Sequence, residues 1–192
     1  MLHQVMGVRF AIALAMLLAF PASAGAVKIG SDLSGTPQQN TGYYCGASDD
    51  CTVVQTTLPG DPYQTRVPFR GLIRSWRFRT VDPEFDPYRL RLWVVRKVAP
   101  ERFRFVRRSK AGIVDDGPGT YVFRTRLRAR KGDRIGIQMP GPLVGVMAWY
   151  VEHENALAYS WFPTPSAGTT VPADPPDSGT EYFYNATVRR KR

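Results

Sequence analysis

Apolar and polar residues alternate in steps of two over much of the chain between residues 70 and 137. The clearest stretch is 121–130 (YVFRTRLRAR), in which apolar residues and Thr125 hold the odd positions and arginines hold the even positions from Arg124 onward. A period of two is typical of a strand with one buried and one solvated face. We therefore expect the odd positions of this strand to be core and the even positions to be surface.

The segments 88–98 and 101–108 show the same period and predict a hairpin that turns at Ala99-Pro100. On its second arm Phe103 and Phe105 share a face. On its first arm Trp93 and Val95 lie opposite the leucines of the strand, which predicts that this strand is buried on both faces near its end.

A change of phase in the segment 71–80 predicts a β-bulge, because Ile73 is out of step with Trp76 and Phe78. About eight to ten strands follow from the whole pattern, with turn residues at the spacing that marks sandwiches and barrels. No amphipathic helix of useful length is found. The predicted fold is all-β, a two-sheet antiparallel β-sandwich of jelly-roll type, with an open β-barrel as the alternative.

The first residues indicate export rather than fold. An apolar run at 10–20 (FAIALAMLLAF) is followed by small residues that end in Ala24, the pattern of a cleaved signal peptide. Cleavage after Ala26 is the alternative. No second apolar run is long enough to span a membrane. The predicted organisation is a signal peptide at 1–24, a loosely structured lead-in at 25–50, a β-sandwich domain at 51–188 and a basic tail at 189–192, in a secreted, extracytoplasmic protein.

Cys45 and Cys51 enclose five residues. In an exported protein a close, isolated pair of cysteines predicts a local disulfide. A zinc site needs four ligands, and the chain after the signal peptide has a single histidine, so we expect no metal and no other cofactor.

The basic residues of the chain suggest a candidate anion-binding surface. The chain has 26 basic and 16 acidic residues, and 21 of the basic residues are arginine. Arginine favours bidentate contacts with carboxylate, sulfate or phosphate. The candidate anion-binding residues are those of two alternating strands, expected to lie side by side: Arg102, Arg104, Arg124, Arg126 and Arg128. The alternative is an ordinary solvated face.

Flat aromatic side chains suggest a second kind of contact. Tyr159 and Trp161 precede a long loop at 163–180 that is rich in proline, and a solvent-facing Trp161 beside Phe162 would suit stacking on a sugar ring. Core packing is the alternative reading of these aromatic residues.

No catalytic motif is present. Catalysis by histidine would rest on His153, whose neighbours Glu152 and Glu154 face the opposite side of a strand, and no Gly-x-Ser-x-Gly elbow occurs. A glycosidase needs two carboxylates across a cleft, and the sequence does not single out such a pair.

Several short motifs resemble those of secreted β-sandwich proteins of actinobacteria that have no assigned function. The resemblance covers most of the chain after the signal peptide and implies the fold and export, but no site residues. The matching segments are 29–33 (IGSDL), 52–55 (TVVQ) after the two cysteines, 71–77 (GLIRSWR), 130–136 (RKGDRIG) and 184–186 (YNA).

The sequence therefore favours a secreted, non-catalytic binding module for anionic or neutral polysaccharide, with an arginine-rich anion-binding face. One alternative is a structural or interaction protein whose arginine face meets an acidic partner protein. Another is a glycoside hydrolase with an unrecognised carboxylate pair. Export argues against nucleic acid as the partner, and the sequence does not predict an oligomeric state.

Overall fold

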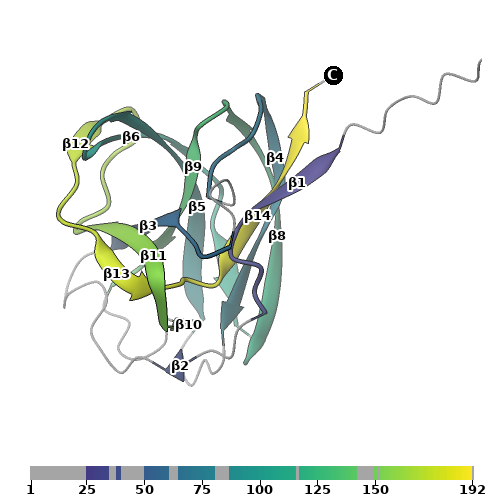
Figure 1. The fold of residues 1–192 in the computed structure, drawn as a ribbon. Coiled ribbons are helices and arrows are strands. Elements are labelled where there is room, and N and C mark those ends of the chain that lie inside the picture. The colour runs from purple at the N-terminus through teal and green to yellow at the C-terminus, as the bar shows by residue number, and fades with distance from the viewer. Residues whose placement is uncertain are drawn as a thin grey trace, which may run out of the picture.

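In the computed structural model, residues 25–34, 38–39, 50–60, 65–80, 87–115, 117–141, 149–150 and 152–191 are described. Within these residues the chain forms no helix and builds two antiparallel sheets that pack face to face (Figure 1). The two sheets do not close into a barrel. The predicted β-sandwich is confirmed.

The smaller sheet has four strands in the order β1-β14-β4-β8. Both of its outer strands, β1 and β8, pair with one neighbour in this sheet. The strand bounds are Ala26–Gly30 for β1, Tyr184–Arg190 for β14, Gly71–Thr80 for β4 and Gly119–Ala129 for β8.

The larger sheet has eight strands in the order β12-β6-β5-β9-β3-β11-β13, with β7 paired to the first half of β5. A further two-stranded ribbon joins β2 (Gln38–Gln39) to β10 (Trp149–Tyr150). The strand bounds of the larger sheet are Cys51–Thr57 for β3, Tyr88–Ala99 for β5, Arg102–Arg108 for β6, Gly112–Val114 for β7, Arg134–Met139 for β9, Glu152–Trp161 for β11, Thr170–Pro172 for β12 and Asp177–Thr180 for β13.

The chain passes repeatedly from one sheet to the other, so that β4 and β8 of the smaller sheet are inserted between strands of the larger one in the sequence. Its first strand, β1, pairs with its last, β14. A chain that alternates in this way between two antiparallel sheets has the arrangement of a jelly roll. It places strands that are distant in the sequence next to one another, and the arrangement of surface charge follows from it.

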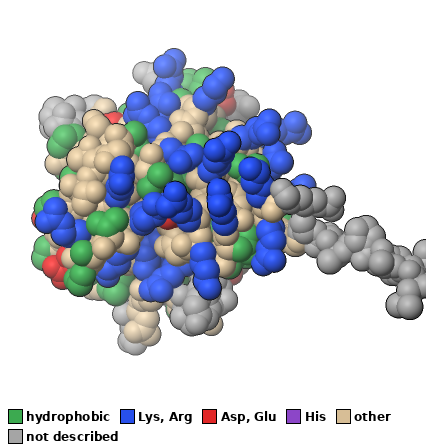
Figure 2. Space-filling view, turned by 90° about the horizontal axis from the view of Figure 1, so that it is seen from above, with side chains coloured by type: hydrophobic (Ala, Val, Ile, Leu, Met, Phe, Trp, Pro, Cys, Tyr) green, Lys and Arg blue, Asp and Glu red, His purple; other side chains and the backbone are tan. Residues whose placement is uncertain are grey.

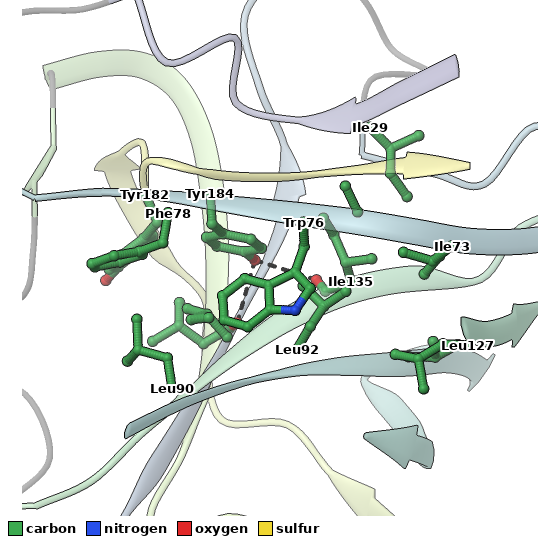
Figure 3. Packing of buried hydrophobic residues seen from close by; sticks show 14 of the residues in the cluster. Ile29, Ile73, Trp76, Phe78, Leu90, Leu92, Leu127, Ile135, Tyr182 and Tyr184 are labelled. Carbon is green, nitrogen blue, oxygen red and sulfur yellow. Dashed lines mark hydrogen bonds between the residues drawn. The ribbon is translucent and has the colours of Figure 1, made fainter. Parts of the chain in front are cut away.

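The main core lies between the sheets and is built from the inward-facing positions of both (Figure 3). Trp76 of β4 packs on Phe123 of β8, with ring centroids 4.1 Å apart. Tyr184 of β14 reaches across the core to the larger sheet. Its hydroxyl accepts a hydrogen bond from the Gln55 backbone N–H at 2.9 Å and lies 3.2 Å from the Ile135 carbonyl oxygen. A buried polar group bonded across the interface fixes how the two sheets are placed.

A second apolar cluster covers the outer face of the larger sheet, as the two-sided pattern of β5 predicts. Trp93 and Val95 belong to this cluster, whereas Leu92 and Val94 belong to the main core. Phe105 packs edge-on against Trp93 with centroids 5.2 Å apart. The predicted burial of this strand on both faces is therefore confirmed.

The alternation in β8 is also confirmed, since its odd positions are buried or half-buried and its even positions are exposed. The predicted bulge in β4 is present, because the pairing of β4 with β8 shifts register between Ile73 and Ser75. The predicted hairpin is present as β5 and β6.

The lead-in predicted at 25–50 contains a strand of the sandwich. Within it, β1 pairs along its whole length with β14, and Ile29 is buried in the main core. Of its five residues only Ile29 is buried, so this strand lacks the alternating apolar pattern by which other strands were predicted. The composition of this segment therefore did not reveal it. The tail predicted at 189–192 begins later, since β14 continues to Arg190.

The predicted signal peptide at 1–24 and Cys45 lie outside the described residues. Cys51 is buried at the start of β3. The predicted disulfide therefore stays a prediction. Within the described part of the chain, nothing forms a helix long and apolar enough to cross a membrane.

Candidate anion-binding surface

The smaller sheet is basic in every strand and acidic in none. It contains Lys28 in β1, three arginines in β4, three in β8 and two in β14, and none of these strands includes an aspartate or glutamate. The exposed positions of β8 and their neighbours form the outer face of this sheet. We call this surface the arginine face; it comprises Arg74, Arg77, Arg124, Arg126, Arg128 and Arg189.

Register decides how the charges of the arginine face are spaced. In β4, Ser75 is the partner of Arg124 and Leu72 is the partner of Arg128. The residues directly opposite these two arginines are therefore uncharged, which limits repulsion between like charges on adjacent strands. Arg189 of β14 is paired with Leu72 on its other side.

Arg102 and Arg104 do not lie beside these arginines. They belong to β6, which pairs with β5 and β12 in the larger sheet, whereas β8 pairs with β4 in the smaller sheet. The expected ladder of two adjacent arginine strands is wrong. Both segments have the same alternating pattern, but the chain crosses to the other sheet between them, and periodicity carries no information about that crossing.

Basic residues from both sheets instead surround two hollows, which lie where the smaller sheet meets the β5–β7 region. The first, here the side groove, has a volume of about 600 Å³ and joins the β8 arginines Arg124 and Arg126 to Arg74, Arg108 and Lys110. Leu127 of β8 also lines this groove. A groove of this volume falls within the range of about 300–1,000 Å³ found for ligand sites.

The second hollow, here the end pocket, has a volume of about 140 Å³. It opens at the end of the sandwich where β14 finishes and β4 begins, and Gly71 forms part of its wall. A side chain at Gly71 would collide with the backbone of Arg189, so these strands approach each other closely here. The basic residues of the lining are Arg70, Arg96, Arg107, Arg128, Arg130 and Lys191.

Figure 2 views the molecule from above Figure 1, where the C-terminal end of β14 lies. Lys and Arg side chains cover much of this surface, and few acidic side chains lie among them. Among the described residues, Arg96 forms an ion pair with Asp133, whereas Arg124, Arg126 and Arg128 have no carboxylate partner. The charge of the arginine face is thus not neutralised within the described part of the chain.

Asp133 is buried and organises the turn after β8. Its carboxylate accepts hydrogen bonds from the Arg96 side chain at 2.7 and 3.0 Å and from the Arg130 backbone N–H at 2.8 Å. The hydrogen bond to Asp133 raises the pKa of Arg96. Both oxygen atoms of the Asp133 carboxylate are committed to these contacts.

One arginine of the basic stretch is structural. Arg134 is buried at the start of β9 and donates to the Thr56 carbonyl oxygen at 2.7 Å and to the Thr65 hydroxyl at 3.1 Å. Burial lowers the pKa of Arg134 to about 10, with a smaller contribution from Arg66. A count of arginines along the sequence therefore overstates the charge available to a ligand.

Trp161 does not face solvent as the sugar-stacking hypothesis requires. It is buried, its ring meets Phe103 and Phe105 edge-on at 5.4 and 5.1 Å, and its indole N–H donates to the Pro172 carbonyl oxygen at 2.8 Å. Phe162 is the exposed residue of this pair. Such packing leaves no open indole face for a sugar, so core packing is the better account of Trp161.

Tyr159 is half-buried and packs on Phe103 with ring centroids 5.1 Å apart. A stacking role for its ring stays a prediction. The predicted loop at 163–180 contains two strands, β12 paired with β6 and β13 paired with β11. Backbone hydrogen bonds join Phe105 to Thr169 at 3.0 Å and Gly168 to Phe105 at 2.6 Å. Val171 and Ala173 of this segment pack against the outer apolar cluster.

No group of three or more His, Cys, Asp or Glu side chains that would hold a metal ion occurs in the described ranges. The backbone of Glu152, His153 and Glu154 is described, but their side chains are not. The residues that sequence reasoning missed are Arg70, Arg96, Arg107, Arg130 and Lys191 of the end pocket. They come from separate strands and turns, and no local pattern joins them.

Comparison with known proteins adds no relative to this picture. No protein-family model, no curated protein and no solved structure matches the chain.

Proposed function

We propose that this protein is a non-catalytic binding module that uses the arginine face to hold an anionic polymer, an extracellular polysaccharide. The observation that supports the proposal is the composition of one continuous sheet, which has basic residues in all four strands and no acidic residue in any of them. The signal peptide predicted at 1–24 agrees with an extracellular ligand.

An extended ligand fits the arginine face better than a compact one. Arg124, Arg126 and Arg128 follow one another on the same side of β8, so their Cα atoms repeat about every 6.7 Å along the strand. Beside this row lie Arg74 on the adjacent strand β4 and Arg189 on β14, the strand beyond β4. A flat, repeating array of cations matches a chain that carries repeated anionic groups.

Repulsion among the cations of the arginine face also favours a polyanion as ligand. Like charges held on one sheet repel, and a polyanion offsets that repulsion while releasing the counterions that both partners hold in free solution. Arginine can also form two parallel hydrogen bonds to one carboxylate or sulfate group. Binding of this kind weakens steeply as salt is added.

The test is retention on dextran sulfate and polygalacturonate matrices, with neutral dextran as a third matrix, over a gradient of sodium chloride. We expect retention on the two anionic matrices and none on neutral dextran. Changing Arg124, Arg126 and Arg128 together to Ser should bring elution to much lower salt. A matched variant changes Arg89, Arg102 and Arg104 to Ser, which removes the same charge from exposed positions in the larger sheet.

The matched variant should elute close to the unchanged protein, because its substitutions lie outside the arginine face. Equal losses in the two variants would show that net charge, not this face, controls retention. Retention on neutral dextran that resists salt would point instead to a site for neutral sugars.

A further inference from the structure

The end pocket is smaller than the arginine face, and its cationic side chains converge on one hollow instead of forming a flat row. Its volume of about 140 Å³ is below the range of about 300–1,000 Å³ typical of sites for whole small molecules. It therefore suits one compact chemical group. None of its described lining residues is acidic.

The cations of the end pocket come from both sheets and from the turn between them. Arg96 and Arg107 belong to β5 and β6 of the larger sheet, Arg128 belongs to β8 of the smaller sheet, and Arg130 lies in the turn that leads to β9. Lys191 follows the last strand. These side chains approach the hollow from different directions.

Arg96 is held in place before any ligand arrives. Its Nε atom and one terminal nitrogen donate to the two oxygens of Asp133 at 2.7 and 3.0 Å. The rest of its planar guanidinium group has no other hydrogen bond among the described residues, so N–H groups remain for a ligand. A donor that is already oriented loses less conformational entropy on binding.

We propose that the end pocket binds a tetrahedral oxyanion, a phosphate or sulfate group. A carboxylate has two oxygens in one plane, which a single arginine satisfies. A tetrahedral group directs its oxygens apart and thereby reaches cations that converge from several elements. Phosphate has the further advantage of a charge between about −1.5 and −2 as a monoester near neutral pH, which offsets more of the repulsion in the pocket.

This inference deepens the proposed function, because a sulfate or phosphate substituent on the polymer would occupy the end pocket while the polymer lies on the arginine face. Binding of the free anion does not depend on the polymer. The two proposals can therefore fail separately.

The test is isothermal titration calorimetry of the whole protein with inorganic phosphate, with sulfate and with acetate, at equal ionic strength. We expect phosphate and sulfate to bind at one saturable site and acetate to bind about tenfold more weakly or not at all, because it loses at least one charge-assisted hydrogen bond. Changing Arg107 and Arg130 together to Ser should weaken phosphate binding by about tenfold or more.

The matched control changes Arg124 and Arg126 to Ser, which removes the same charge from the arginine face and the side groove but not from the end pocket. All four residues are exposed, so both variants should fold, and thermal unfolding checks this. Acetate binding as tight as phosphate, or an equal loss in the two variants, would overturn the inference. The control pair should still lose polymer retention, so its two readouts separate the end pocket from the arginine face.

Retention of a phosphorylated or sulfated polymer that is weakened by the Arg107 and Arg130 substitutions would show that the anion is a substituent of the polymer. Unchanged polymer retention in that variant, together with lost phosphate binding, would assign the pocket to free phosphate or sulfate.

Discussion

Arg96 in β5 donates two hydrogen bonds to Asp133 in the turn after β8, from Nε to Oδ1 at 2.7 Å and from a terminal nitrogen to Oδ2 at 3.0 Å. The two partners are unequally exposed, since the Arg96 side chain is 28% accessible and that of Asp133 is 1% accessible. The pair therefore links a strand of the larger sheet to a turn that leaves the smaller one, and water reaches only the arginine.

This asymmetry predicts unequal costs for breaking the pair. Arg96→Met leaves a buried carboxylate without its ion-pair partner and should lower the free energy of unfolding by about 3–5 kcal/mol. Asp133→Asn leaves a cation that water can hydrate and should cost about 1–3 kcal/mol. Urea unfolding measures both. Arg104→Met, an exposed arginine opposite Arg96 in register, serves as control and should cost under about 0.5 kcal/mol.

The alternation in β8 predicts opposite sensitivities at adjacent residues. Phe123→Ala should lower the free energy of unfolding by about 2–4 kcal/mol, because the ring packs on Trp76 in the main core, although it is only half-buried. Arg124→Ala should cost well under about 1 kcal/mol, because its side chain is exposed. Similar losses in chemical denaturation would contradict the assigned faces of the strand.

Tyr184→Phe tests the link between the sheets. The change removes the hydroxyl that accepts from the Gln55 backbone N–H and leaves that buried group without a partner, at a cost of about 1–3 kcal/mol in unfolding free energy. Tyr121→Phe is the matched control, because its hydroxyl donates to the Gly117 carbonyl oxygen at the rim of the sandwich. A cost for Tyr184→Phe no larger than that of the control would show that the hydroxyl does not hold the sheets together.

Tyr88 predicts a loss of stability at high pH. Burial raises the pKa of Tyr88 from 10.0 to about 12, so the folded state holds this proton more tightly than the unfolded state. The contribution is fully present below about pH 10 and is lost as the pH rises through about 12, with a slope of up to about 1.4 kcal/mol per pH unit. Unfolding free energies measured between pH 9 and 11 should fall less steeply in Tyr88→Phe than in the unchanged protein.

At pH 7 the same substitution should cost little. The buried hydroxyls of Tyr88 and Thr80 are near enough for Thr80 to offset part of the rise in the pKa of Tyr88, but neither makes a hydrogen bond of normal geometry within the described residues, so removing the Tyr88 hydroxyl gives up little. A large loss at pH 7, or parallel pH curves for the two proteins, would contradict the assignment.

Sequence alone determined the fold class and the side to which most strand residues point. The faces of β8, the two-sided burial of Trp93 and Val95 and the bulge after Ile73 were all predicted, because side chains alternate along a strand for reasons of local backbone geometry. The edge strand β1 was not predicted, since its place in the sheet comes from its pairing with β14 and not from its own composition.

The candidate site was only half predicted. Arg124, Arg126 and Arg128 were identified as a row on one face, and they form one. Their supposed neighbours Arg102 and Arg104 lie in the other sheet, and Trp161 is covered by the segment that follows it. Only the tertiary structure decided these placements, because strand pairing and loop packing join segments distant in sequence. The end pocket arises in the same way: its cations converge only after the crossings between the sheets bring separate strands together.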